Sequence, residues 1–141
     1  MSNRLNSAFL SAYIELDKVC CLKFGTATGG VTEYINRLIT ARFAPERDEV
    51  LPRLVKYRNI RNRMAHEEGA FGRIDEIGKS DIRWIESFKK AMQKKRDPIS
   101  LYLRKARRYA RRRRARKVIV VTALILLALG AAAAFAVSKF L

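Results

Sequence analysis

The sequence has little of the material from which disulfide-bonded, redox and metal-dependent proteins are built. Its two cysteines, Cys20 and Cys21, are adjacent, a spacing that matches neither a disulfide framework nor the CxxC pairs of redox and zinc sites. We expect both to be reduced, partly buried core residues in a cytoplasmic compartment. With one histidine, no carboxylate pair on an obvious shared face and no glycine-rich phosphate loop, the sequence predicts no cofactor and no metal site.

Alternating strand patterns, internal repeats and low-complexity linkers are also missing. Instead, apolar residues recur at intervals of three or four, which predicts amphipathic helices. We expect an all-α fold, in which a small up-and-down bundle of four helices is followed by a long C-terminal helix that continues into the membrane.

The first predicted helix covers residues 3–24 with Asn3 as its cap, and the second covers 32–43 with Thr32 as its cap. The third begins near 46–52 and runs to about 68. Ser80 is expected to cap the fourth, and Asp97 and Pro98 are the expected cap and first residue of the last helix. The core face predicted for the fourth helix consists of Ile82, Ile85, Phe88 and Met92, with Trp84 beside it.

Charge is absent from residues 118–137, a run of twenty residues in which Thr122 alone carries a polar group. At about 1.5 Å per helical residue this run spans roughly 30 Å, the thickness of a bilayer's hydrocarbon core. The rest of the chain is too small to cover such a helix on every side. Residues 1–20 carry charges instead of the apolar run of a secretory signal peptide. We therefore predict one transmembrane helix at 118–137.

No acidic residue follows Asp97, whereas basic residues crowd the stretch just before the apolar run. Lys139 is the one basic residue after that run, so the positive-inside rule predicts a single-pass cell-membrane protein with a cytoplasmic amino terminus. Anionic lipid headgroups are the favoured partner of the basic stretch, and nucleic acid is the competing one. The membrane-proximal basic residues are Arg104, Lys105, Arg107, Arg108, Arg111, Arg112, Arg113, Arg114, Arg116 and Lys117.

These observations predict four parts in the chain. Residues 1–96 form the helical bundle, 97–117 a basic juxtamembrane helix, 118–137 the transmembrane helix and 138–141 a short tail. The net charge of +17 is shared unevenly, because much of the basic excess belongs to the juxtamembrane helix.

The sole histidine, His66, lies in the segment YRNIRNRMAH of the third predicted helix. At 100° per residue, one face of this helix mixes polar and apolar side chains. Polar groups on an apolar face are costly to bury unless they are paired, so this face predicts a partner in another helix, a second subunit or a ligand. Its residues are Arg58, Arg61, Asn62 and His66, together with Leu51, Leu54, Val55 and Ala65.

The segment Arg61-Asn62-x-x-Ala65-His66 resembles the RNxxAH form of the R-x(4-6)-H motif of the HEPN superfamily, and it is placed late in a helix of a short bundle, as in that family. The resemblance covers roughly residues 3–96. It implies a homodimeric, metal-independent endoribonuclease with Arg61, Asn62 and His66 as catalytic residues and Arg58 and Arg61 as phosphate-binding residues. His is suited to move protons near neutral pH, and Arg to stabilise the charge on the phosphorane.

Other interpretations of the same residues stay open. The site is either catalytic, or it binds RNA or a nucleotide without turnover, or His66 and Asn62 hydrogen-bond in a satisfied core or dimer contact. One His per chain means that acid and base would come from two subunits. The functional prediction is a candidate ribonuclease at the cytoplasmic membrane face, and the alternative is a membrane-tethered adaptor that binds a protein partner without catalysis.

Overall fold

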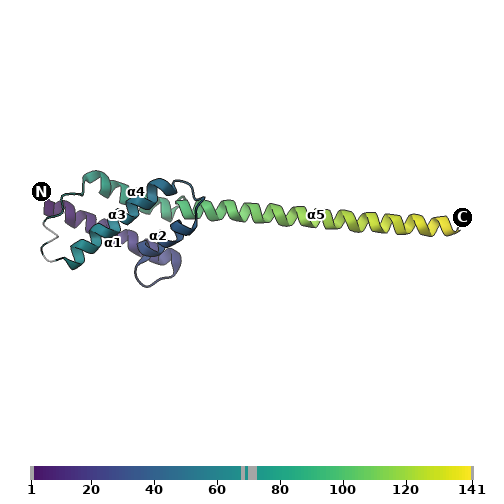
Figure 1. Ribbon diagram of the computed structural model, residues 1–141, viewed down its shortest axis with the longest axis horizontal. Coiled ribbons are helices and arrows are strands. Elements are labelled where there is room, and N and C mark those ends of the chain that lie inside the picture. Colours follow the sequence, from purple (N-terminus) through teal and green to yellow (C-terminus); the bar gives the residue numbers. More distant parts are fainter. Residues whose placement is uncertain (1, 68, 70–72, 141) are drawn as a thin grey trace. The chain divides into compact units, whose positions relative to one another are not determined.

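The computed structural model describes residues 2–67, 69 and 73–140, and this part of the chain is helical without any strand. The helices are α1 (Ser2–Phe24), α2 (Gly30–Thr40), α3 (Arg47–His66), α4 (Lys79–Gln93) and α5 (Pro98–Phe140) (Figure 1). The chain divides into two compact units, Met1–Leu103 and Arg104–Leu141. The all-α class and the four helices followed by a long C-terminal helix are thus confirmed.

The core of the first unit lies where α1 packs against α2 and α4, and where α2 packs against α3. Fully buried side chains from every one of these helices meet there: Phe9, Leu16, Tyr34, Leu38, Leu54 and Ile85. The face predicted for the fourth helix is confirmed, because Ile85, Phe88 and Met92 are buried and Ile82 packs against them. The Trp84 ring stacks on that of Phe88, with 5.0 Å between the ring centroids.

The cysteines are free, as expected. Cys20 is fully buried, and its thiol contacts the sulfur of Met92 at 3.7 Å. Burial raises the pKa of the Cys20 thiol to about 12, so it stays protonated at neutral pH. Cys21 is partly buried beside Asp17. Both residues therefore act as packing residues.

Three predicted helix caps are wrong. Asn3 lies inside α1, because that helix begins at Ser2. Thr32 lies inside α2, which begins after Gly29; there the Val31 amide donates to Asp17 Oδ1 of α1 at 2.8 Å. Ser80 lies inside α4, which begins after Gly78, whose amide donates to the carboxylate of Asp81 at 2.8 Å. The second helix is also shorter than predicted and ends at Thr40, and α3 ends at His66; residue 68, its predicted end, lies outside the described residues.

Asp97 and Pro98 do form the predicted cap and first residue of α5. The Asp97 carboxylate is fully buried and accepts a hydrogen bond from the Ser100 amide at 3.2 Å. It also accepts hydrogen bonds from Lys23 Nζ at 2.9 Å and from the Tyr34 hydroxyl at 2.9 Å. These hydrogen bonds hold the first turn of α5 against α1 and α2. The first unit accordingly includes this turn and extends to Leu103.

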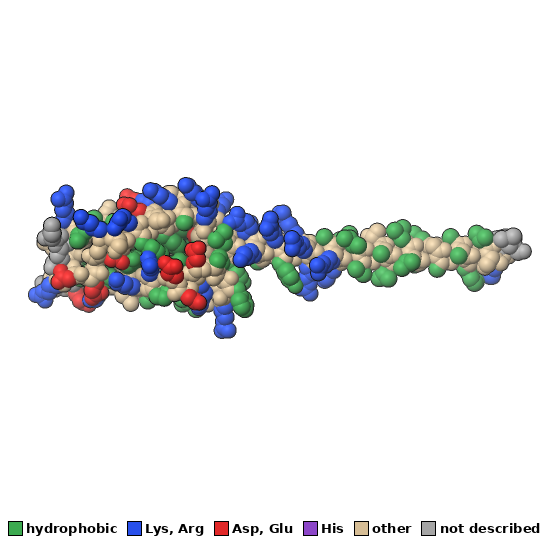
Figure 2. All heavy atoms as spheres, turned by 90° about the horizontal axis from the view of Figure 1, so that it is seen from above, with side chains coloured by type: hydrophobic (Ala, Val, Ile, Leu, Met, Phe, Trp, Pro, Cys, Tyr) green, Lys and Arg blue, Asp and Glu red, His purple; other side chains and the backbone are tan. Residues whose placement is uncertain are grey.

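The second unit is the exposed remainder of α5. Among the described residues, α5 supplies the one segment long and apolar enough to cross a membrane, with a mean hydropathy of 2.7 over 18 residues and none of that window buried. Figure 2 shows hydrophobic side chains along this segment and Lys and Arg side chains gathered just before it. Its length and composition agree with the predicted span at 118–137.

Candidate functional site

The predicted site residues all lie on α3, but they are less buried than expected. Arg58 and Arg61 are half-buried, whereas Asn62 and His66 are exposed. The buried face of α3 consists of Val50, Leu54, Tyr57 and Ile60, so the polar residues flank the core-facing side instead of sharing it. The polar residues of this face are therefore not enclosed in the core, and the predicted partner stays a prediction.

Arg58, Arg61 and Asn62 line a groove of about 450 Å³ on the surface of the first unit. The other walls come from α1, from the turn that precedes α2, and from the first turn of α2. These walls comprise Tyr13, Ile14, Asp17, Lys18, Thr28, Gly29 and Thr32. Within the groove, the Arg61 guanidinium donates to the Asn62 side-chain oxygen at 3.3 Å, which orients the two groups together.

The groove holds more positive than negative charge. Its cations are Lys18, Arg58 and Arg61, and none of them forms an ion pair with an acid in the described part of the chain. Its one acid, Asp17, is engaged by the α2 amino terminus through the Val31 amide. The positive end of the α2 dipole offsets the charge of this carboxylate, so Asp17 neutralises little of the positive charge of the three cations. That charge is available to an anion.

Hydroxyl and amide groups add uncharged partners for such an anion. Thr28, Thr32 and Asn62 line the same groove as the cations. Tyr13 lies in the wall next to Arg58 and Arg61, and burial together with the Asp17 charge raises the pKa of its phenol above the ordinary value. That hydroxyl therefore stays protonated at neutral pH. Arginine forks with neutral donors around them suit the oxygens of a phosphate group.

His66 stands apart from this groove. It is the last residue of α3, it is exposed, and it is not among the groove's lining residues. The structure thus brings together Arg58, Arg61 and Asn62 of the predicted set and leaves His66 outside. Within one chain, the arrangement brings together two arginines and an amide, which have the chemistry to bind an anion, without placing the imidazole among them.

Sequence reasoning missed the part of the groove that α1 and α2 supply. Tyr13, Asp17 and Lys18 belong to an ordinary amphipathic helix, and no motif marks them. Thr32 is predicted only as a helix cap, and no motif marks Thr28. Their assembly depends on how α1 and α2 cross α3, which a periodicity within one helix does not encode.

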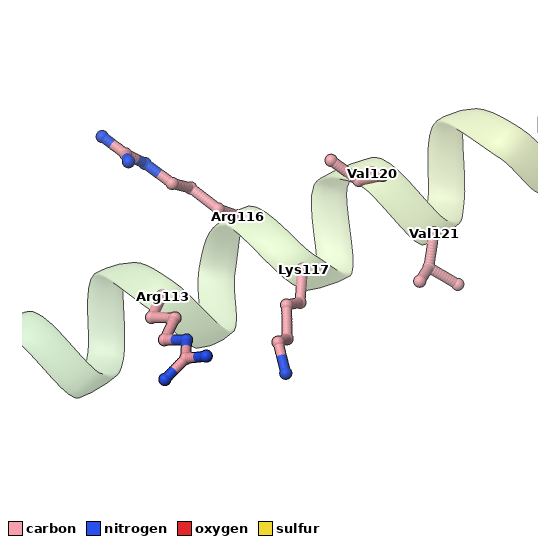
Figure 3. A pocket seen from close by; sticks show the side chains of 5 residues that line it. All are labelled: Arg113, Arg116, Lys117, Val120 and Val121. Carbon is pink, nitrogen blue, oxygen red and sulfur yellow. The ribbon is translucent and has the colours of Figure 1, made fainter.

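A second hollow lies on α5, at the boundary between its basic and apolar parts. Arg113, Arg116, Lys117, Val120 and Val121 line it, and all come from a single helix, so it is open surface and not a cavity (Figure 3). In Figure 3, Arg113, Lys117 and Val121 point to one side of the helix. Among the described residues, no cluster of His, Cys, Asp and Glu that could hold a metal ion is present.

The Family of unknown function (DUF6548) matches residues 7–121, so the chain belongs to this family. The match covers the bundle, the basic stretch and the first residues of the apolar segment. No curated protein and no solved structure matches the chain.

Proposed function

We propose that this protein is a single-pass membrane protein whose cytoplasmic bundle binds RNA through its phosphates. The observation that carries the proposal is the groove lined by Arg58, Arg61 and Lys18, none of which forms an ion pair with an acid among the residues that the structure describes. Arginine binds phosphate oxygens with two parallel donors, and such charge-assisted bonds are among the stronger ones in proteins. The groove is open on the surface, as a site for a passing chain must be.

The choice of RNA over another phosphate ligand has two supports. The segment Arg61-Asn62-x-x-Ala65-His66 resembles the HEPN motif, and many proteins of that superfamily act on or bind RNA. The chain's net charge of +17 also favours a polyanion over a small, weakly charged ligand.

The membrane part of the proposal rests on α5. Its apolar segment is long enough to cross a bilayer, and ten basic residues precede it against Lys139 after it. The positive-inside rule then places the bundle in the cytoplasm of the cell. RNA is present in that compartment, and the protein would hold it at the membrane face.

The test is RNA affinity measured on the full-length protein in phosphatidylcholine nanodiscs. Fluorescence anisotropy of a labelled single-stranded oligouridine reports binding across a salt series. Replacing Arg58 and Arg61 by Gln should weaken binding by about tenfold or more and reduce the slope of log affinity against log salt by about 1.4, since each single-strand phosphate contact adds about 0.7.

The matched control replaces Arg53 and Arg63 by Gln, which removes the same charge from the same helix outside the groove. These two residues pair with Glu49 at 3.4 Å and with Glu76 at 2.9 Å, so they have little free charge for RNA. Equal losses in the two variants, or no RNA binding by the wild type, would contradict the proposal. If the wild type binds no RNA, a membrane-tethered adaptor becomes the better explanation of the protein's function.

A metal-independent ribonuclease is the second candidate function, and the exposure of His66 favours it because a bound RNA can reach the imidazole. In a dimer, His66 of one subunit would serve an RNA held by Arg61 of the other. His66→Ala should then lower cleavage by about 10² to 10⁴ while leaving RNA affinity unchanged, and a chelator should have no effect. Wild-type protein that binds RNA without cleaving it would exclude this second candidate and leave the first intact.

A further inference from the structure

The basic residues of the collar, which we define as Arg104–Lys117, fall into two sets on opposite sides of α5. At 100° per residue, the distal set occupies an arc of about 160°, with Ala106, Tyr109 and Ala110 on the facing arc. The proximal set occupies that facing side one to two turns further along. The distal set is Arg104, Lys105, Arg107, Arg108, Arg111 and Arg112; the proximal set is Arg113, Arg114, Arg116 and Lys117.

The collar is longer than the headgroup layer is thick. A bilayer's polar layer measures roughly 5–8 Å on each side of the hydrocarbon core. At about 1.5 Å per residue, the Arg112 backbone lies about 9 Å and the Arg104 backbone about 21 Å before Val118, where the apolar segment begins. Even at a tilt of about 40°, Arg104 stays about 16 Å away. Lipid headgroups therefore account for the proximal set and leave most of the distal set in water.

The geometry of the proximal set fits lipid. In Figure 3, Arg113, Lys117 and Val121 point to the same side of α5. Lys117 lies one turn after Arg113, and Val121 lies two turns after it. A headgroup phosphate between the two cations would place its acyl chain along the apolar surface that follows. The distal set lies further from the apolar segment, which begins about 9 Å after Arg112.

We propose that the distal set is a second RNA-binding surface, which contacts the backbone of a single strand outside the membrane. All of its side chains are exposed, and none of them forms an ion pair within the described part of the chain. The choice of RNA as the polyanion rests on the proposed function. The residues involved are different from those of the groove.

The exposed ring of Tyr109 favours a nucleic acid, which carries bases, over a ligand that offers only negative charge. This residue is 71% exposed and lies about 14 Å before the apolar segment, beyond the depth at which interfacial aromatic residues anchor a helix. The ring lies on the facing arc at its edge, next to Lys105 and Arg112, and exposed aromatic rings beside cations are platforms on which single-stranded nucleic acids stack their bases. A Tyr109→Ala substitution should therefore weaken RNA binding about fivefold or more.

The experiment compares two quadruple variants of the full-length protein in nanodiscs that contain phosphatidylglycerol. One replaces Arg104, Lys105, Arg107 and Arg108 by Gln, and the other replaces Arg113, Arg114, Arg116 and Lys117 by Gln. Both remove four charges from an exposed helix, and Gln keeps helix propensity. The distal variant should reduce the salt slope of oligouridine binding by about 3, whereas the proximal variant should leave it near the wild-type value. An equal or larger loss in the proximal variant, or no loss in the distal one, would overturn the proposal.

The Arg58→Gln and Arg61→Gln double variant in the same assay separates this inference from the proposed function. If the distal variant loses affinity while the groove variant does not, the collar binds RNA and the groove does not. If the groove variant loses affinity while the distal variant does not, the groove binds RNA and only the proposal for the collar is overturned. Nanodiscs leave both membrane faces open to RNA, so a change in topology does not enter the comparison.

Discussion

Replacing Asp97 by Ala should lower the free energy of unfolding of the bundle by about 3–5 kcal/mol, the usual loss when one partner of a buried ion pair is removed. Asp97 is fully buried, and its carboxylate binds the Lys23 ammonium at 2.9 and 3.1 Å. The Lys23 side chain is only 20% exposed, so the substitution leaves a largely buried charge without its partner.

Two further losses contribute to this total. The buried Tyr34 hydroxyl, which donates to Asp97 at 2.9 Å, is left without its acceptor. The first turn of α5 loses its cap, because the Ser100 amide donates to the same carboxylate, and caps are worth about 1 kcal/mol. A domain of this size has a free energy of unfolding of roughly 5–15 kcal/mol, so Asp97→Ala removes a large share of it.

Urea unfolding of the full-length protein in detergent micelles measures this loss through Trp84, the chain's sole tryptophan. Its ring stacks on Phe88 and packs near Tyr57, so its fluorescence reports the bundle and not the apolar segment. Lys23→Met serves as the comparison variant and tests the ion pair alone, because Asp97 keeps its bonds from Tyr34 and Ser100. A free energy of unfolding of Asp97→Ala within about 1 kcal/mol of wild type would refute the reasoning.

The same network predicts a pH dependence. Burial alone would raise the pKa of Asp97, but hydrogen bonds from Ser100, Lys23 and Tyr34 outweigh it and hold the pKa below its ordinary value. The stabilisation by the carboxylate is therefore complete above about pH 4 and is lost as the pH falls through the folded-state pKa. Asp97→Asn should show a shallower loss of stability in acid than wild type, and equal slopes would contradict this assignment.

Two other predictions concern packing and orientation. Gly30→Ala should destabilise the bundle by about 1–3 kcal/mol in urea unfolding, because a Cβ there would lie 2.7 Å from Cys20 Cβ and against the backbone of Asp17 and Cys21. Gly78→Ala is the control and should change urea unfolding little, because the nearest atom to its Cβ would be 3.4 Å away. A reporter fused after Leu141 should be shielded from cytoplasmic enzymes and one fused before Met1 should be accessible to them, and the opposite pattern would contradict the proposed cytoplasmic bundle.

The helices and the apolar segment could be predicted because their signals are local. Periodicity placed Ile85, Phe88 and Met92 on a buried face, and the Asp97-Pro98 pair marked the start of α5. The caps of α2 and α4 could not be found in the same way. The α2 amino terminus uses Asp17 from another helix, and α4 uses Asp81 in place of Ser80.

The site was predictable only in the part that one helix contributes. Arg58, Arg61 and Asn62, which recur at helical spacing on α3, line one groove, whereas their predicted role stays a prediction. The predicted face was right only in part, because Leu54 is buried as expected, whereas Ala65 and His66 lie outside the core. An Arg-x4-His spacing therefore does not show by itself whether both side chains face the same groove.

The most direct test of the central claim is ultraviolet crosslinking of oligouridine to the full-length protein in nanodiscs, followed by mass spectrometry of the crosslinked peptides. The protein carries Gln at Arg104, Lys105, Arg107 and Arg108, so that the collar contributes little. The account predicts crosslinks on the α1 peptide with Tyr13 and on the α3 peptide with Arg58 to Asn62, both reduced when Arg58 and Arg61 are also replaced by Gln. Crosslinks that map only to other surfaces, or that persist in full after that replacement, would contradict it.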